Sequence, residues 1–236
     1  MSNSWFAFRQ FTVHQDRCAM KVSTDACIQG ALTPLPDGPV RVLDVGTGTG
    51  LLSLMIAQRN KNAVIDAIEI DPAAAAQASD NVAASPFADR IIVHEADAKT
   101  FFSTGRYDLV ICNPPFFRRS LLGPDDGRNA ARHDLHLRQE DILTILDQHL
   151  ADSGHASILL PVPEMDQWIR LAESSGWTLC DDYHIKDNDN ARVHRRIGIF
   201  GRDRMPARSG IIVIKGPDKG YTEYFARLLA PFYLRL

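Results

Sequence analysis

From about residue 40 almost to its end, the chain alternates between short apolar segments typical of buried strands and segments with helical character. The predicted strands cover residues 40–45, 64–70, 91–96, 108–113, 155–161, 179–186, 193–200 and 210–215. The predicted helices cover residues 23–32, 51–59, 72–85, 141–150, 164–175 and 221–231. Strands that alternate with helices predict an α/β fold with a doubly wound, mainly parallel sheet. We expect an antiparallel strand pair towards the end of the chain.

Composition narrows the class of protein. The chain has 236 residues, of which 45% are hydrophobic, and this is enough to bury the core of one large domain. It contains no apolar run of about 18 residues, so we expect no membrane span. The first residues do not resemble a secretory signal. The cysteines have no metal-type spacing, and we interpret them as reduced thiols of a cytoplasmic protein without a metal site. They are Cys18, Cys27, Cys112 and Cys180.

The basic residues are unevenly distributed. The net charge of −3 argues against indiscriminate nucleic-acid binding. Between residues 192 and 219, however, eight basic residues face only two acidic ones, and a second basic group lies within 118–133. One face of the protein could therefore meet a polyanion, and solvated surface is the alternative for each single basic residue. The candidate contacts for such a polyanion are Arg118, Arg119, Arg192, Arg195 and Arg196.

A glycine-rich turn, residues 44–50, follows the first strand of the alternating region and opens a helix. Its sequence, Asp-Val-Gly-Thr-Gly-Thr-Gly, has a glycine at every second position from Gly46 through Gly48 to Gly50, unlike the G-x-G-x-x-G spacing of dinucleotide sites. Glycines let the backbone approach a ligand closely, and Asp44 suits a ligand that carries a cationic amino-acid group. The pattern resembles motif I of class I methyltransferases that use S-adenosylmethionine (SAM).

Two acidic residues follow the next strands. Glu69 lies about twenty residues beyond the glycine turn, where a ribose-binding acid is expected. Asp71 competes for this role, but it precedes Pro72 and is better suited to cap a helix. After the third strand, Asp97 is a candidate acceptor for the adenine amine of the cofactor, and a helix cap is the open alternative.

The segment Asn113-Pro114-Pro115-Phe116 ends the fourth strand abruptly, because proline cannot donate to a ladder. The Asn113 side-chain oxygen and the Pro114 carbonyl can accept both hydrogens of a planar –NH2 group, and Phe116 offers a stacking face. Simple strand termination is the alternative. Because a sulfonium already activates its methyl group, transfer needs alignment more than a strong base. We therefore predict that Asn113, Pro114 and Phe116 hold the amine of a flat heterocycle for methylation.

Several further stretches resemble the bacterial valine-tRNA adenine N6-methyltransferase family. They are Phe8-Arg9-Gln10-Phe11, the segments 16–22 and 24–25, Gly216-Pro217-Asp218, Tyr221-Thr222-Glu223-Tyr224 and Phe232-Tyr233-Leu234. The resemblance implies a Rossmann-like fold with a mainly parallel seven-stranded sheet and an antiparallel terminal pair. It also implies methylation of adenine 37 in a tRNA anticodon loop. Phe116 departs from the tyrosine of many relatives, and Ser23 from a frequent glycine.

The resemblance further implies that an N-terminal segment, residues 1–39, closes over the cofactor site of a methyltransferase domain, residues 40–236. Lys21 and Thr24 then become candidate cofactor contacts, with a helix cap as the alternative role of Thr24. The expected partner is tRNA, and we expect a monomer.

Other classes of protein remain open at this point. A glutamine N5-methyltransferase of release factors uses a similar amide seat but carries a helical domain ahead of motif I. A DNA adenine methyltransferase needs a recognition domain for which the chain is short, and a guanine N2-methyltransferase of ribosomal RNA is also compatible. A dinucleotide oxidoreductase disagrees with the glycine spacing. An RNA-binding protein without turnover is the non-enzymatic alternative.

Overall fold

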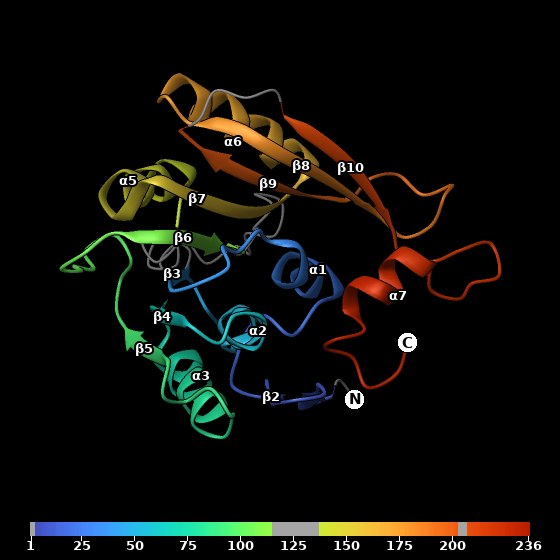
Figure 1. The fold of residues 1–236 in the computed structure, drawn as a ribbon, viewed down its shortest axis with the longest axis horizontal. Helices are drawn as coiled ribbons and strands as arrows, with labels where there is room; N and C mark the ends of the chain where they lie inside the picture. Colours follow the sequence, from blue (N-terminus) through green and yellow to red (C-terminus); the bar gives the residue numbers. More distant parts are fainter. Residues whose placement is uncertain (1–2, 115–136, 203–206) are drawn as a thin grey trace, which may run out of the picture.

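A sheet of eight strands runs through the centre of the protein (Figure 1). The computed structural model describes residues 3–114, 137–202 and 207–236. Across the sheet the order is β10 (Arg208–Val213), β8 (Thr178–Lys186), β9 (Arg195–Gly201), β7 (Leu150–Pro161), β6 (Tyr107–Cys112), β3 (Val40–Val45), β4 (Ala63–Glu69) and β5 (Ile91–Glu95). No helix in these ranges is long and apolar enough to cross a membrane.

The strand directions confirm the predicted, mainly parallel sheet and correct one detail. β9 is antiparallel to both β7 and β8, whereas all other neighbouring pairs are parallel. The described residues form eight strands in this sheet and not seven, because β10 adds to the outer edge of β8 in parallel. The antiparallel strand therefore lies inside the sheet, between two strands that both run the other way.

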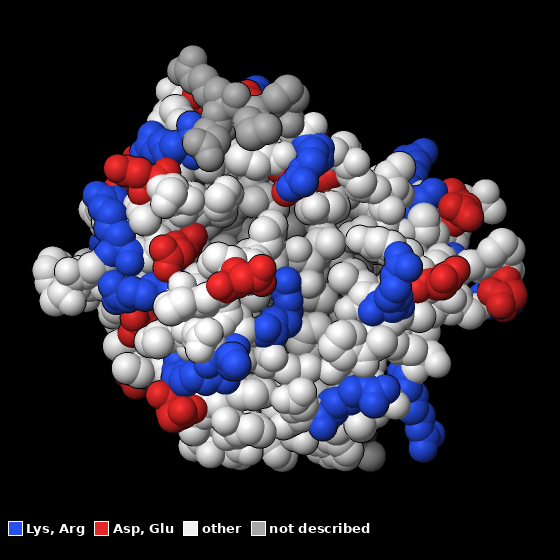
Figure 2. Space-filling view, in the orientation of Figure 1, with Lys and Arg blue, Asp and Glu red and all other residues white. Residues whose placement is uncertain are grey.

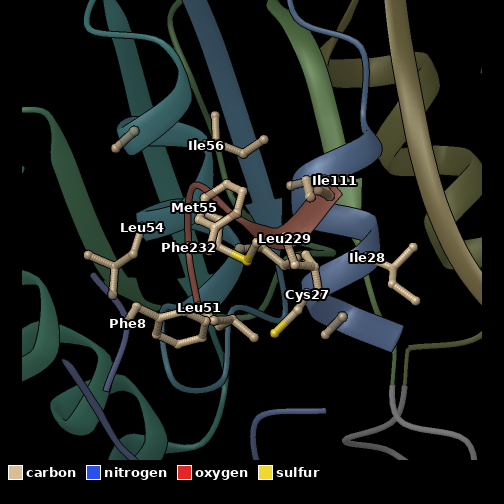
Figure 3. Packing of buried hydrophobic residues seen from close by; sticks show 14 of the residues in the cluster. Phe8, Cys27, Ile28, Leu51, Leu54, Met55, Ile56, Ile111, Leu229 and Phe232 are labelled. Atoms are coloured by element: carbon tan, nitrogen blue, oxygen red, sulfur yellow. The ribbon is translucent and has the colours of Figure 1, made fainter. Parts of the chain in front are cut away.

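Helices cover the two faces of the sheet. Those packed on one face are α1 (Thr24–Leu32), α2 (Leu51–Arg59), α3 (Pro72–Ala83) and α7 (Glu223–Leu229), and those on the other are α5 (Gln139–His149) and α6 (Val162–Ser174). Each face of the sheet has its own hydrophobic core. Successive strand residues point to opposite faces, so Val42 belongs to the core under α1 and α2, and Leu43 to the core under α5 and α6. In Figure 3, Cys27 of α1 and Met55 of α2 lie near Leu229 and Phe232 from the end of the chain, whereas Ile28 points away from them.

The N-terminal residues form a small element that the sequence did not predict. β1 (Trp5–Ala7) pairs antiparallel with β2 (Thr12–His14). Phe8 forms a β-bridge with Tyr233, and the two rings lie 6.0 Å apart between centroids. The hairpin is thereby fixed to the C-terminal residues, which Figure 1 shows beside it.

The parallel strands bring the predicted site residues to one place. β3, β4, β5 and β6 all run in the same direction, so their carboxyl ends meet at the same edge of the sheet. The glycine turn, Glu69, Asp97 and Asn113 each follow or end one of these strands. Ligands bind at this edge in open α/β folds.

Candidate active site

A cavity of about 200 Å³ opens at the carboxyl edge of the parallel strands. Most of its wall is built from five parts of the chain. These are residues 18–22, Val45 to Thr49 of the glycine turn, Ile68 to Asp71, Ala96 to Lys99, and Asn113 with Pro114; the helices add Ala26, Leu51, Leu52 and Ala74, and Leu137 completes the wall. Of the predicted site residues, Lys21, Gly46, Gly48, Glu69, Asp97, Asn113 and Pro114 all line this cavity. Residues far apart in the sequence therefore meet as the parallel topology requires.

The glycine turn takes a backbone conformation that other residues rarely adopt. Gly46, Gly48 and Gly50 have φ angles of 70°, 57° and 81°. A Cβ added to Gly46 or Gly48 would meet nothing within 4 Å, so these two glycines border open space. Gly50 begins α2 from the left-handed region, lies against Ala78 and does not line the cavity. The turn thus presents a bare backbone edge to a ligand.

Asp44 lies behind this turn and is completely buried. Its Oδ2 accepts hydrogen bonds from the Thr47 hydroxyl at 2.6 Å and from the Ser53 hydroxyl at 2.7 Å. Its Oδ1 is also buried and has no hydrogen-bond partner within the described residues. Burial raises the pKa of this carboxyl to about 6. A buried, half-satisfied carboxylate suits a nearby cationic ligand group, although Asp44 itself does not line the cavity.

The charge of Asp44 should make the stability of the ligand-free protein depend on pH. A pKa of about 6 in the folded state, against 3.8 as the ordinary value, means that ionised Asp44 lowers the stability by about 3 kcal/mol. The loss is absent below pH 4 and complete above pH 6. Asp44→Asn should therefore be more stable than the wild type at pH 7.5, and this difference should shrink at pH 4.5. Urea unfolding at both pH values measures it.

The matched control for this prediction is Asp71→Asn. Asp71 is an exposed helix cap, and asparagine caps a helix as well as aspartate does. A stability difference between Asp44→Asn and the wild type that is the same at both pH values would contradict the prediction.

Glu69 is fixed at the cavity wall by backbone donors. Its Oε2 accepts from Gly48 N at 2.8 Å, and its Oε1 from Ile70 N at 2.9 Å and Asp71 N at 3.0 Å. A carboxylate accepts about four hydrogen bonds, so one position remains for a ribose hydroxyl. Asp71 instead caps α3 through Ala73 N and Ala74 N, which confirms the cap interpretation.

Asp97 lies at the cavity wall in a local turn. Its Oδ1 accepts from Lys99 N at 2.9 Å, and its Oδ2 lies 3.4 Å from Lys99 Nζ. No helix begins at Asp97, so the helix-cap alternative is wrong, and its contact with an adenine amine stays a prediction.

Asn113 and Pro114 complete the cavity at the end of β6. Asn113 is half-buried, and no hydrogen bond within the described ranges engages its side chain. Its amide is therefore open to a ligand that enters the cavity. Phe116, Arg118 and Arg119 lie outside the described residues, and so do the other basic residues of that segment.

The N-terminal segment borders the same cavity. Residues 18–22 line it, and Lys21 Nζ lies 3.5 Å from Asn3 O. Thr24 is exposed, is absent from the cavity wall and is the first residue of α1, whose cap is Ser23. Its predicted cofactor contact is therefore not supported.

Two buried amides on α3 hold the N-terminal segment, and neither was predicted from the sequence. Asn81 Oδ1 accepts from His14 N at 2.9 Å, and its Nδ2 donates to His14 O at 2.8 Å and to Thr49 O at 2.9 Å. Gln77 Oε1 accepts from Arg17 N at 2.7 Å. Their i, i+4 spacing inside an alanine-rich helix was the available signal, because such amides point to the same side.

One predicted RNA contact is corrected by the structure. Arg196 is only 7% exposed, and its guanidinium donates to Asp182 Oδ1 at 3.0 Å and Oδ2 at 2.6 Å and also to Asp166. These donors are engaged within the protein, which argues against a phosphate contact. Arg192 is exposed, whereas Arg195 is half-buried with its Nε 3.8 Å from Asp25.

The arrangement of the fold matches known methyltransferases. A predicted O-methyltransferase from Agrobacterium tumefaciens superimposes with a TM-score of 0.66 at 20% identity, covering 88% of this chain and 96% of that one. Residues 25–125 match the family described as methyltransferase small domain.

Full-length relatives decide the family. A tRNA1(Val) (adenine(37)-N6)-methyltransferase from Dyadobacter fermentans is 43% identical over 99% of this chain and 98% of its own length. The enzyme of the same name from Escherichia coli O157:H7 is 39% identical over 97% and 94%. The chain belongs to the tRNA1(Val) (adenine(37)-N6)-methyltransferase family. It is a methyltransferase, and SAM is its methyl donor.

The cavity of this methyltransferase fits SAM chemically. The bare glycine edge leaves room for the amino-acid part, the unpaired oxygen of Asp44 favours a cation nearby, and Glu69 retains an acceptor position for the ribose. No group of three or more potential metal ligands occurs among the described residues.

Proposed function

We propose that this protein transfers the methyl group of SAM to N6 of adenine 37 in the anticodon loop of a valine tRNA. The observation that carries the proposal is the position of Asn113 and Pro114 in the wall of the same cavity as the glycine turn and Glu69. The residues that would hold the target amine and those that would hold the methyl donor line one cavity. This arrangement supports direct transfer of the methyl group from donor to amine. The full-length similarity to enzymes of that name supports the choice of substrate.

The chemistry requires a planar amine to be held with its lone pair towards the methyl group. SAM supplies an electrophilic methyl group on its sulfonium. The adenine amine is a weak nucleophile because its lone pair is delocalised into the ring. Asn113 Oδ1 and the Pro114 carbonyl would accept hydrogen bonds from its two N–H groups and so raise the electron density on the nitrogen. Stacking of the base on Phe116 stays a prediction, because this residue lies outside the described part of the chain.

Methylation of total tRNA from cells that lack the modification tests the proposal. The purified protein and labelled SAM should place the label in one nucleoside, N6-methyladenosine, which mass spectrometry then maps to position 37 of a valine tRNA. A transcript of that tRNA with guanine at position 37 should stay unlabelled. Label in a glutamine of a release factor, in guanine of ribosomal RNA, or in neither would overturn the proposal.

Arg192 is the clearest candidate for a phosphate contact. It is exposed in the connection between β8 and β9, which emerges at the same edge of the sheet as Asn113. On the face seen in Figure 2, acidic and basic residues are interspersed, so RNA binding there needs particular side chains and not a continuous basic surface. We therefore retain Arg192 and Arg195, but not Arg196, as candidate RNA contacts.

Arg192→Ala should weaken tRNA binding by roughly fivefold to tenfold near 0.1 M salt and reduce the salt slope by about 1. Filter binding or fluorescence anisotropy at several salt concentrations measures both. The control is Arg202→Ala, because Arg202 follows the far end of the antiparallel strand β9 and lies at the opposite edge of the sheet. Equal tRNA affinity of Arg192→Ala and the wild type would show that Arg192 is solvated surface.

Three further predictions accompany the proposed function. A tRNA-modifying enzyme of this family is expected in the cytoplasm, where its substrate is. We also keep the prediction of a monomer, and that of residues 1–39 closing over the cofactor. Closure is supported by the contribution of residues 18–22 to the cavity wall.

A further inference from the structure

A buried polar cluster lies directly behind the catalytic end of β6 and takes no part in the chemistry above. Gln29 of α1 is 0% exposed. Its Nε2 donates to the Cys112 carbonyl at 3.1 Å and to the Ser157 carbonyl at 3.1 Å, and it lies 3.3 Å from Ser157 Oγ. The hydroxyl of Thr33, the residue that caps the end of α1, lies 2.8 Å from the same Ser157 Oγ.

This amide occupies a place where an apolar side chain would serve packing better. The residues around it on α1 are Cys27, Ile28 and Ala31, and all belong to the core. Gln29 Oε1 is buried without a hydrogen-bond partner within the described ranges. An unpaired buried oxygen is unfavourable, so the glutamine is a poor choice for stability alone. Local rules of this kind are broken mostly at functional sites.

The carbonyl that Gln29 holds belongs to the peptide unit that leads into Asn113. The peptide unit is planar, so a fixed Cys112 carbonyl also fixes the direction of the Asn113 N–H and the position of its Cα. Beyond Asn113, Pro114 and Pro115 have no N–H with which a neighbouring strand could hold the chain. The amide of Gln29 thus provides a hydrogen bond immediately ahead of the point at which the chain loses its own donors.

The hydrogen bond from Gln29 to the Ser157 carbonyl connects Gln29 to the neighbouring strand as well. Ser157 lies on β7, beside Ile111 of β6 in the parallel register. One side chain of α1 therefore joins the last residue of β6 to the adjacent strand. Ala26, one turn before Gln29, lines the cofactor cavity, so the same helix contacts both the donor site and the acceptor strand.

We propose that Gln29 is a positioning residue that aligns the amide of Asn113 with the methyl donor. This inference rests on the proposed function. Transfer depends on the position of the acceptor to within about 1 Å, and a misplacement of that size lowers rates by about a hundredfold. Gln29 is absent from the cavity wall, so its loss should change turnover much more than binding.

The test compares Gln29→Leu and Gln29→Met with two controls from the same cluster. Thr33→Val and Ser157→Ala remove a buried hydroxyl but keep the bond from Gln29 to the Cys112 carbonyl. We expect the Gln29 variants to lower kcat by about 30- to 100-fold, with the KM for tRNA and the Kd for SAM within about twofold of the wild type. The controls should keep kcat within about twofold at 25 °C, even where their thermal midpoint falls.

Hydrogen exchange gives a readout that does not need tRNA. The backbone amide of Asn113 should exchange roughly fivefold faster or more in Gln29→Met than in the wild type, and at the wild-type rate in Thr33→Val. A wild type that fails to methylate tRNA refutes the proposed function, and the exchange rates then decide the role of Gln29 by themselves. A folded Gln29 variant with wild-type kcat, or with wild-type exchange at Asn113, overturns the inference. So does an equal loss of kcat in Thr33→Val.

Discussion

Replacing Asn113 by alanine is expected to lower kcat for tRNA methylation by about 10²–10³-fold, because one hydrogen-bond acceptor for the target amine is lost. The affinities for SAM and for tRNA should stay within about threefold of the wild type. The side chain of Asn113 makes no hydrogen bond within the described residues, so its removal leaves no partner unsatisfied there. Single-turnover kinetics, together with calorimetry for SAM, separate these effects.

Two further variants sharpen this prediction. Asn113→Asp keeps an acceptor oxygen and should retain more activity than alanine, whereas Asn62→Ala removes an exposed asparagine from the turn between α2 and β4, at the opposite edge of the sheet, and should have no effect. Unchanged turnover in Asn113→Ala would contradict the proposed mechanism. Lost tRNA binding in the same variant would assign Asn113 to substrate affinity and not to the transfer step.

Replacing Arg196 by methionine should produce the largest loss of stability that we expect from one substitution. Arg196 forms a buried pair with Asp182, which is itself 8% exposed. Removal of Arg196 leaves the buried Asp182 without a cationic guanidinium, with the His184 ring 2.9 Å away. Breaking such a pair lowers the free energy of unfolding by about 3–5 kcal/mol. For a chain of this length the thermal midpoint should fall by about 2–4 °C per kcal/mol. Calorimetry and urea unfolding measure the change.

The control for Arg196→Met is Asp189→Ala. The pair between Asp189 and Lys186 involves an aspartate that is 68% exposed, so its loss should change stability by about 0–1 kcal/mol. The double variant Arg196→Met with Asp182→Leu should regain part of the loss, because the buried charge is removed and Asp166, the other partner of Arg196, is 51% exposed. A reduced tRNA affinity of folded Arg196→Met, with normal stability, would restore Arg196 as an RNA contact.

The parts of the fold that follow local rules could be predicted from the sequence. Some signals determine the structure of only the few residues around them. They are the apolar strand segments, the glycine turn, Pro72 after its capping residue, and the two prolines after Asn113. The site residues could be predicted as a group for a related reason. Each lies at the carboxyl end of a parallel strand, so the topology brings together Gly48, Glu69 and Asn113 without any knowledge of long-range contacts.

The missed features depend on contacts between distant segments. The hairpin of β1 and β2 is held by residues near position 233, and β10 joins the sheet at an edge that no local pattern identifies. The wrong prediction for Arg196 as an RNA contact beside Arg195 has a simpler reason. Neighbouring residues in a strand point to opposite faces, so both could not have met a phosphate on one surface. This alternation was present in the sequence.

The bridge between Phe8 and Tyr233 also constrains how the protein is made. A ribosome releases the chain from the N-terminus, so the hairpin leaves the exit tunnel long before its partner residues have been synthesised. Phe6 and Phe8 would then be left without the aromatic ring of Tyr233 for most of translation. Residues 18–22, which form part of the wall of the cofactor cavity, therefore follow a hairpin that is fixed in place only after Tyr233 has been synthesised.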